Sequence, residues 1–189
     1  MYESEGELEN KLIKQLAAFG YEKISIKNIS DLKKNLKIQL EKLNKKTFTE
    51  NEFLQIVNHL EKGSVFEKAH ILRDRFLVKA EKGEDFYIQF LKSKKEENIF
   101  QITHQVEMSG KYENRYDVTI LINGLPLIQV ELKRRGLEMK EAFNQINRYH
   151  KHSFVGTLFE YIQIFIISNG VDVKYFANNY GQSYEQTFF

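Results

Sequence analysis

The feature that most constrains the fold of this chain is a pair of alternating runs joined at Asn123-Gly124. Residues 115–122 and 125–133 place apolar side chains at every second position, and an Asn-Gly pair between two such runs is a strong signal of a β-hairpin. Since side chains alternate faces along a strand, each run has one apolar face. The chain is therefore expected to build a β-sheet around this hairpin.

Further helices and strands are predicted on both sides of the hairpin. Before residue 74, apolar residues recur at helical spacing, and Ser4 and Thr49 are predicted to be the N-caps of two of these helices. After residue 74, short runs of alternating apolar and polar residues are separated by polar turns. The predicted helices cover residues 5–19, 31–46, 50–59, 64–73 and 137–150, and the other predicted strands cover residues 76–80, 86–91, 99–107, 161–168 and 171–177.

This order of elements predicts an α/β fold with a central mixed β-sheet flanked by helices. The first helix (residues 1–20) and the helix of residues 137–150 are expected to pack on the sheet. Residues 76–177 would form the sheet core with the active site, and residues 31–73 would form a peripheral helical insertion. We expect one domain over residues 1–189, because 42% apolar and 29% charged residues at this length suit a single core.

Composition excludes several functional classes. The chain has no cysteine, which removes disulfides, thiolate zinc sites and cysteine nucleophiles and fits a reducing, cytoplasmic setting. Its apolar runs are far shorter than the ~20 residues that span a bilayer, and its acidic start is unlike a signal peptide. We therefore expect a cytoplasmic protein without a membrane partner. The five histidines suggest no metal site, and a net charge of +2 identifies no partner.

Three ionisable side chains occupy the alternate positions of the hairpin strands, on the face opposite the apolar residues. They are Asp117, Glu131 and Lys133. Two carboxylates and an ammonium on apolar strands are costly unless they are used. Carboxylate pairs suit Mg²⁺, which can position an attacking water and offset the charge of a scissile phosphate. A lysine beside them could orient the nucleophile or stabilise the transition state. An ordinary Glu–Lys salt bridge on a partly exposed hairpin is the alternative interpretation.

The hairpin register decides whether these groups meet. A plain two-residue turn, continued without a bulge, would put Asp117 and Glu131 on opposite faces. We therefore predict a three-residue loop that ends at Gly124, with this glycine left-handed in a bulge, so that Asp117 lies opposite Gln129. A loop of residues 123–125 would also keep the two carboxylates on one face.

The residues around these positions carry a family resemblance. Asp117, followed by Gln129-Val130-Glu131-Leu132-Lys133, resembles the Asp…Glu-x-Lys active site of the PD-(D/E)xK nuclease superfamily. The surrounding sequence is similar to the N-terminal nuclease domain of the restriction (R) subunit of type I restriction–modification enzymes, most strongly from residue 107 to residue 177. The segments that carry this similarity are Glu113–Thr119, Asn123–Leu127, Glu131–Gly136, Glu141–Tyr149 and Ile167–Gly170.

The resemblance implies a PD-(D/E)xK restriction-endonuclease-like core and an endonuclease of the type I restriction class. Such a subunit cleaves double-stranded DNA with Mg²⁺, for which Mn²⁺ is a substitute, after ATP-driven translocation by a motor C-terminal to the nuclease domain. It works in a complex with modification and specificity subunits.

The resemblance also assigns roles to individual positions. Asp117 and Glu131 would be metal ligands, Lys133 would be the catalytic lysine, and Glu9 would supplement the metal site. Gln145 and Tyr149 match a Gln-x-x-x-Tyr motif that positions DNA, and at i and i+4 they share a helix face. Separately, Arg134 and Arg135 are suited to contact DNA phosphates beside the site, although a solvated strand end is an equally ordinary interpretation.

No Gly-x-x-x-x-Gly-Lys-Ser/Thr phosphate loop occurs in the sequence, so the motor of such a subunit is absent from it. We therefore expect these residues to be an N-terminal fragment of a longer protein, unable to hydrolyse ATP and weakly active or inactive alone. Two alternatives remain open: a stand-alone nuclease of the same superfamily in repair or recombination, and a non-catalytic module that holds DNA or partner subunits.

Overall fold

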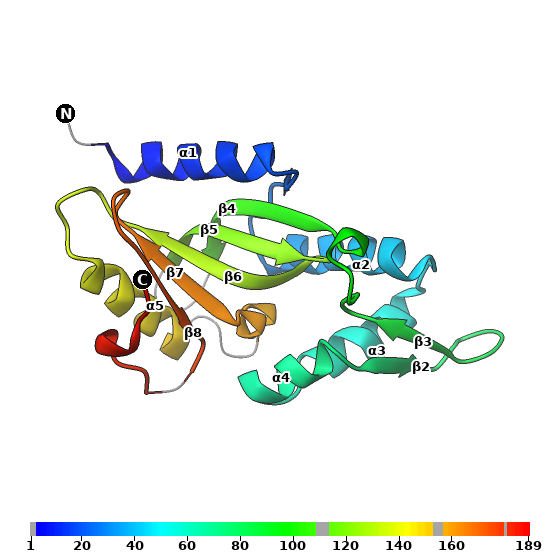
Figure 1. Cartoon of the computed structure of the whole chain (residues 1–189). Helices are drawn as coiled ribbons and strands as arrows, with labels where there is room; N and C mark the ends of the chain where they lie inside the picture. Colours follow the sequence, from blue (N-terminus) through cyan, green and yellow to red (C-terminus); the bar gives the residue numbers. More distant parts are fainter. Residues whose placement is uncertain (1–2, 109–113, 153–156, 180) are drawn as a thin grey trace.

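A computed structural model describes residues 3–108, 114–152, 157–179 and 181–189 of the chain (Figure 1). It confirms the predicted α/β class and the mixed sheet. Six strands form this sheet in the order β1-β4-β5-β6-β7-β8, with β1–β4 and β6–β7 parallel and the other neighbours antiparallel. Strands β2 and β3 form a separate antiparallel pair.

The helices and strands lie close to their predicted positions. The α-helices of the described residues are α1 (Glu5–Ala18), α2 (Ile29–Asn44), α3 (Glu50–Leu60), α4 (Val65–Ile71) and α5 (Met139–His152). The strands are β1 (Glu22–Lys23), β2 (Arg75–Val78), β3 (Phe86–Gln89), β4 (Phe100–Met108), β5 (Asn114–Ile122), β6 (Leu125–Leu132), β7 (Ile164–Ser168) and β8 (Val173–Ala177).

Two differences from the predicted elements have identifiable causes, one local and one from pairing with a distant strand. The predicted strand of residues 161–168 begins only at Ile164, because Leu158–Tyr161 forms a 3₁₀ turn capped by Thr157. The two-residue strand β1 was not predicted, since it is too short to show an alternating pattern and exists only through its parallel pairing with β4.

Helix starts follow the local sequence closely. Ser4, Thr49 and Ser64 each accept a hydrogen bond from a backbone N–H of the first helical turn, and the glutamate three residues on closes a capping box in each case. The predicted N-caps Ser4 and Thr49 are therefore confirmed. None of the helices in the described parts of the chain has the length and apolar character needed to cross a membrane.

The sheet separates two hydrophobic clusters. Helix α1 covers one face of the sheet, where Leu8 and Ile13 pack against apolar side chains of β4, β5 and β6. Helix α5 lies on the opposite side (Figure 1). The larger cluster joins α5 to α2, α3 and the β2–β3 pair, and it includes Leu36, Leu40 and Ile56, which have no exposed surface. The helices of the predicted insertion (residues 31–73) thus share a core with the sheet.

The predicted three-residue hairpin loop is wrong. Ile122 pairs with Leu125 across a two-residue turn in which Asn123 and Gly124 both have positive φ, 52° and 84°, as a type I′ turn requires. The left-handed Gly124 is confirmed. The register then shifts at a bulge between Ile120 and Leu121, so that the strands return to an arrangement that keeps both carboxylates together.

Packing against α2 explains why the turn is tight. A Cβ on Gly124 would lie only 2.8 Å from the Cα of Leu36, so the helix rests directly on the turn. The buried Asn123 side chain donates to the carbonyl of Phe90 at 2.9 Å and accepts from the N–H of Ile99 at 2.8 Å. These contacts fix the turn from outside the hairpin.

Candidate active site

The bulge brings the two hairpin carboxylates to adjacent positions. Beyond it, Val118 pairs with Val130 as the last pair of this register, and Asp117 and Glu131 are the next residues on the two strands. The predicted pairing of Asp117 with Gln129 is therefore wrong. Gln129 lies opposite Thr119 instead, whose hydroxyl donates to its side-chain oxygen at 2.7 Å.

The regular alternation of side chains between the two faces of the sheet breaks at Asp117 on strand β5. Val118 packs in the cluster beneath α1, whereas Tyr116 packs in the larger core, with its ring centroid 5.0 Å from that of Phe159. Residues two apart in a regular strand share a face, so the backbone turns between these positions. Asp117 consequently reaches β6 with its side chain, where Oδ2 accepts the backbone N–H of Leu132 at 2.8 Å.

Strand β4 is irregular at the matching point. Gln105 has a φ of 54°, a left-handed conformation that costs energy for a residue with a side chain. The β4–β5 pairing is regular on either side but omits Gln105 and Asp117, which would otherwise face each other. Backbone strain is thus held directly beside one of the two carboxylates.

Glu131 is the most deeply buried ionisable side chain of the site, with no exposed surface. Its Oε1 accepts from Nε2 of Gln129 at 3.2 Å, while its Oε2 is buried without a hydrogen-bond partner in the described part of the chain. Burial raises the pKa of Glu131 well above its ordinary value, and the charge of Asp117 raises it further. Burial also raises the pKa of Asp117, partly offset by the N–H of Leu132 and the charge of Lys133.

Lys133 follows the two carboxylates on β6 and is mostly buried, with 12% of its side chain exposed. Its positive charge lowers the pKa of both Asp117 and Glu131, so it lies within electrostatic reach of each. Its Nζ is 4.0 Å from Oε1 of Glu5, on α1. No salt bridge between Lys133 and Glu131 occurs among the described residues, which argues against the ordinary Glu–Lys pair considered from the sequence.

Glu9 reaches this region from α1. Its buried carboxylate oxygen Oε1 lies 2.6 Å from Nδ1 of His104 and accepts from Nε2 of Gln105 at 3.2 Å. The negative charge of Glu9 also raises the pKa of Asp117. Glu9 is therefore near the carboxylate pair but is held by two side chains of β4.

His104 and Gln105 were not singled out as site residues from the sequence. One signal was available for His104, because it shares the parity of the apolar Phe100, Ile102 and Val106 in an alternating run. A polar side chain on an apolar face calls for a partner, here Glu9. No sequence signal marks the unusual backbone of Gln105.

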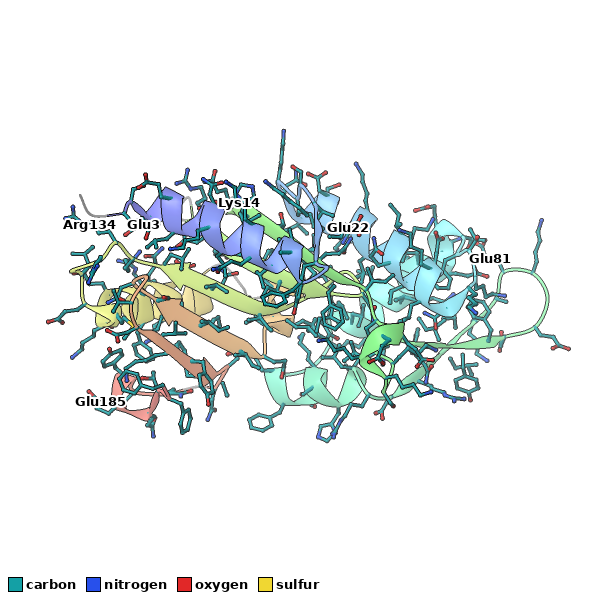
Figure 2. The ribbon with its side chains drawn as sticks, turned by 45° about the horizontal axis from the view of Figure 1, so that its top comes forward. Glu3, Lys14, Glu22, Glu81, Arg134 and Glu185 are labelled. Atoms are coloured by element: carbon teal, nitrogen blue, oxygen red, sulfur yellow. The ribbon has the colours of Figure 1, made fainter. Side chains whose placement is uncertain are left out.

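The other predicted site residues lie around this centre. Arg134 and Arg135 are exposed just beyond β6, and the backbone N–H of Arg134 donates to Glu5 at 3.3 Å, near the start of α1 (Figure 2). Gln145 is half-buried on α5, which packs against β6 and β7. The side chain of Tyr149 lies outside the described residues, so the predicted Gln-x-x-x-Tyr pair is not placed.

The chemistry of the carboxylate pair suits a hard divalent cation. Two mutually repelling carboxylates, one with a buried oxygen that has no hydrogen-bond partner among the described residues, are the donors that Mg²⁺ prefers. Within the described ranges no three Asp, Glu or His side chains gather to hold a metal. This is compatible with Mg²⁺, which often takes only one or two protein carboxylates and completes its shell with water or phosphate.

Comparisons with known proteins agree on one family. A family model described as the N terminus of the type I restriction enzyme R protein matches residues 2–184. The Type I restriction enzyme SsaAORF53P endonuclease subunit of Staphylococcus saprophyticus is 45% identical over all of this chain and 21% of its own length. The corresponding SauCOLORF180P subunit of Staphylococcus aureus is 46% identical over 94% of this chain and 20% of its own length.

A relative from another organism gives the same result. The Type I restriction enzyme EcoprrI endonuclease subunit of Escherichia coli is 44% identical over 94% of this chain and 59% of its own length. The chain thus spans about a fifth of the staphylococcal relatives and somewhat more than half of the Escherichia coli relative.

Proposed function

Since this chain belongs to the family of type I restriction enzyme R protein N termini, we propose that it is the DNA-cleaving module of such an enzyme. Its relatives are named endonuclease subunits. The observation that carries the proposal is Glu131, which is fully buried next to Asp117 and Lys133 and has one oxygen without a hydrogen-bond partner in the part of the chain that the structure describes. Leaving a carboxylate oxygen buried and unbound is costly, and a catalytic metal site is a sufficient reason for it.

In this proposal the hairpin is the active site of a PD-(D/E)xK nuclease. Asp117 and Glu131 would hold Mg²⁺, or Mn²⁺ in its place, which when bound supplies an activated water and offsets charge on the scissile phosphate. The N–H of Leu132 orients Asp117, and Gln129, itself held by Thr119, orients Glu131. Both carboxylates are thereby fixed before DNA arrives.

Lys133 supplies the positive charge of the proposed site. Its ammonium would orient the attacking water and stabilise the negative charge that develops on the phosphate oxygens. Its neighbours Arg134 and Arg135 are exposed, which suits contacts to the phosphate backbone of the duplex. Gln145 and Tyr149 on α5 would position DNA beside these groups.

The remaining activity of the enzyme would belong to the rest of the parent protein. Cleavage would follow ATP-driven translocation by a motor in that part, and ATP would be a cofactor of the parent only. Modification and specificity subunits would be partners of the assembled enzyme and would supply sequence recognition.

The decisive experiment uses the full restriction complex with a Glu131→Ala R subunit. Cleavage of plasmid DNA in Mg²⁺ should be lost, while DNA-stimulated ATP hydrolysis should be retained, because the motor is untouched. Unchanged cleavage would support a non-catalytic docking module instead. Efficient cleavage of plain duplex DNA by these 189 residues alone would support a stand-alone nuclease, and we expect little or none.

A further inference from the structure

A basic cleft of about 640 Å³ lies at the end of the sheet away from the carboxylate pair. Its walls come from the C-terminal end of α2, the β2–β3 pair and the segment that leads into β4, on the right in Figure 1. The cleft is lined by four cationic side chains: Lys42, Lys45, Arg75 and Lys92. The exposed Tyr87 and a single carboxylate, Glu97, also line it.

Glu97 is the one acidic side chain among the described residues that line the cleft with these four cations. None of the ion pairs found in the described parts of the chain includes any of them. Like charges gathered in a concave surface repel one another and concentrate positive potential there. A structural role explains only part of the set. Lys42 and Lys45 lie at the C-terminal end of α2, where positive charge interacts favourably with the helix dipole, but Arg75 lies on β2 and Lys92 in the loop after β3.

The walls of the cleft are tied together. Asn44 donates from its amide to the carbonyl of Gln89 at 3.0 Å, and the backbone N–H of Gln89 donates back to the Asn44 oxygen at 2.8 Å. This pair joins the end of α2 to β3. The cations are therefore presented by a preorganised surface, which lowers the cost of binding a ligand.

The cleft is separate from the catalytic centre. Ile99, on its wall, accepts the backbone N–H of Asn123 at the hairpin turn. Asp117 lies five residues before Ile122 on β5, which corresponds to about 17 Å along a strand. A duplex advances by about 3.4 Å per base pair, so this separation equals about five base pairs.

We propose that this cleft is a second DNA-binding surface, which holds the phosphate backbone of double-stranded DNA through Lys42, Lys45, Arg75 and Lys92. Charges spread over three elements match a run of backbone phosphates better than the compact polyphosphate of a nucleotide, and no phosphate-binding glycine loop is present in the sequence. The proposal rests on the proposed function only for the choice of DNA as the polyanion.

The test measures binding without cleavage. A labelled duplex is titrated with the 189-residue chain carrying Glu131→Gln, in EDTA, over a range of salt concentrations starting at about 50 mM. The cleft variant adds Lys42→Glu, Lys45→Glu and Lys92→Glu. The control adds Lys14→Glu, Lys23→Glu and Lys62→Glu, which are exposed lysines outside the cleft with the same change in charge.

We expect the cleft variant to bind DNA at least about tenfold more weakly than the control. The negative slope of log K against log salt should become shallower by about three. Neutral single variants, Arg75→Gln and Lys92→Gln, should each lower the slope by about one and guard against misfolding of the triple variant. Equal losses in cleft and control variants would overturn the proposal. So would displacement of DNA from the cleft by millimolar ATP, which would indicate a nucleotide site.

The outcome is independent of catalysis. The assay uses an inactive background without metal, so failure of the cleavage proposal leaves the binding result interpretable. Conversely, loss of binding in the cleft variant says nothing about the role of Glu131.

Discussion

Replacing Gly124 with alanine should weaken the hairpin that carries both carboxylates. Gly124 has a φ of 84°, and a left-handed conformation costs a residue with a Cβ roughly 1–2 kcal/mol. The new Cβ would also lie 2.8 Å from the Cα of Leu36 and 3.3 Å from the Cβ of Gln39, so α2 would have to move. Overpacking of this kind costs about 1–3 kcal/mol, which brings the loss to about 2–5 kcal/mol in total.

Gly83 provides a matched control for the conformational part of this loss. Its φ is 85°, and a Cβ there would meet nothing within 4 Å. Gly83→Ala should therefore lose only the roughly 1–2 kcal/mol of backbone strain. In a domain of this size, 1 kcal/mol shifts Tm by about 2–4 °C, so Gly124→Ala should melt about 2–12 °C below Gly83→Ala.

Thermal unfolding followed by circular dichroism measures both variants under the same conditions. A lower Tm for Gly124→Ala than for Gly83→Ala is the expected order. Equal melting temperatures would refute the reasoning, because they would mean that α2 does not rest on the turn as described.

Two further predictions concern the carboxylate pair. The pKa of Glu131 in the folded state is raised above its ordinary value of 4.5, so the folded state keeps a proton that the unfolded state releases. Without metal, the contribution of Glu131 to stability should therefore be complete below about pH 4.5. It should fall as the pH rises through the raised pKa. Urea midpoints in EDTA from about pH 4 to about pH 8 should show this fall, and Glu131→Gln should make it smaller, leaving the part that the raised pKa of Asp117 contributes; a curve parallel to that of the unchanged protein would contradict the assignment. Mg²⁺ or Mn²⁺ at ten times its Kd should add about 1.4 kcal/mol, a Tm rise of roughly 3–6 °C that Asp117→Asn should abolish. A Tm that is unchanged, or that rises equally in the variant, would count against a site built on this pair.

Local features of the sequence determined most of the secondary structure. The caps Ser4 and Thr49 mark the starts of α1 and α3, and the alternating runs beside Asn123-Gly124 become β5 and β6. These features depend on contacts between residues a few positions apart, which a sequence displays directly. Strand β1 could not be found in this way, since its two residues are a strand only because β4 lies beside them.

The candidate site divides along the same line. The sequence indicated Asp117, Glu131 and Lys133 from their parity, and the Asp…Glu-x-Lys pattern with its flanking segments indicated the family, to which the chain belongs. It also indicated that the two carboxylates had to share a face. The route to that arrangement was predicted wrongly, as a longer loop in place of a tight turn followed by a bulge.

Only the tertiary structure decided the rest of the site and the basic cleft. The tight turn depends on α2 resting on Gly124, and the position of Glu9 depends on His104, from elements far apart in the chain. The four cations of the cleft likewise meet from three separate segments. Residues distant in sequence are brought together by the burial of the shared core, and no local pattern encodes which of them will meet.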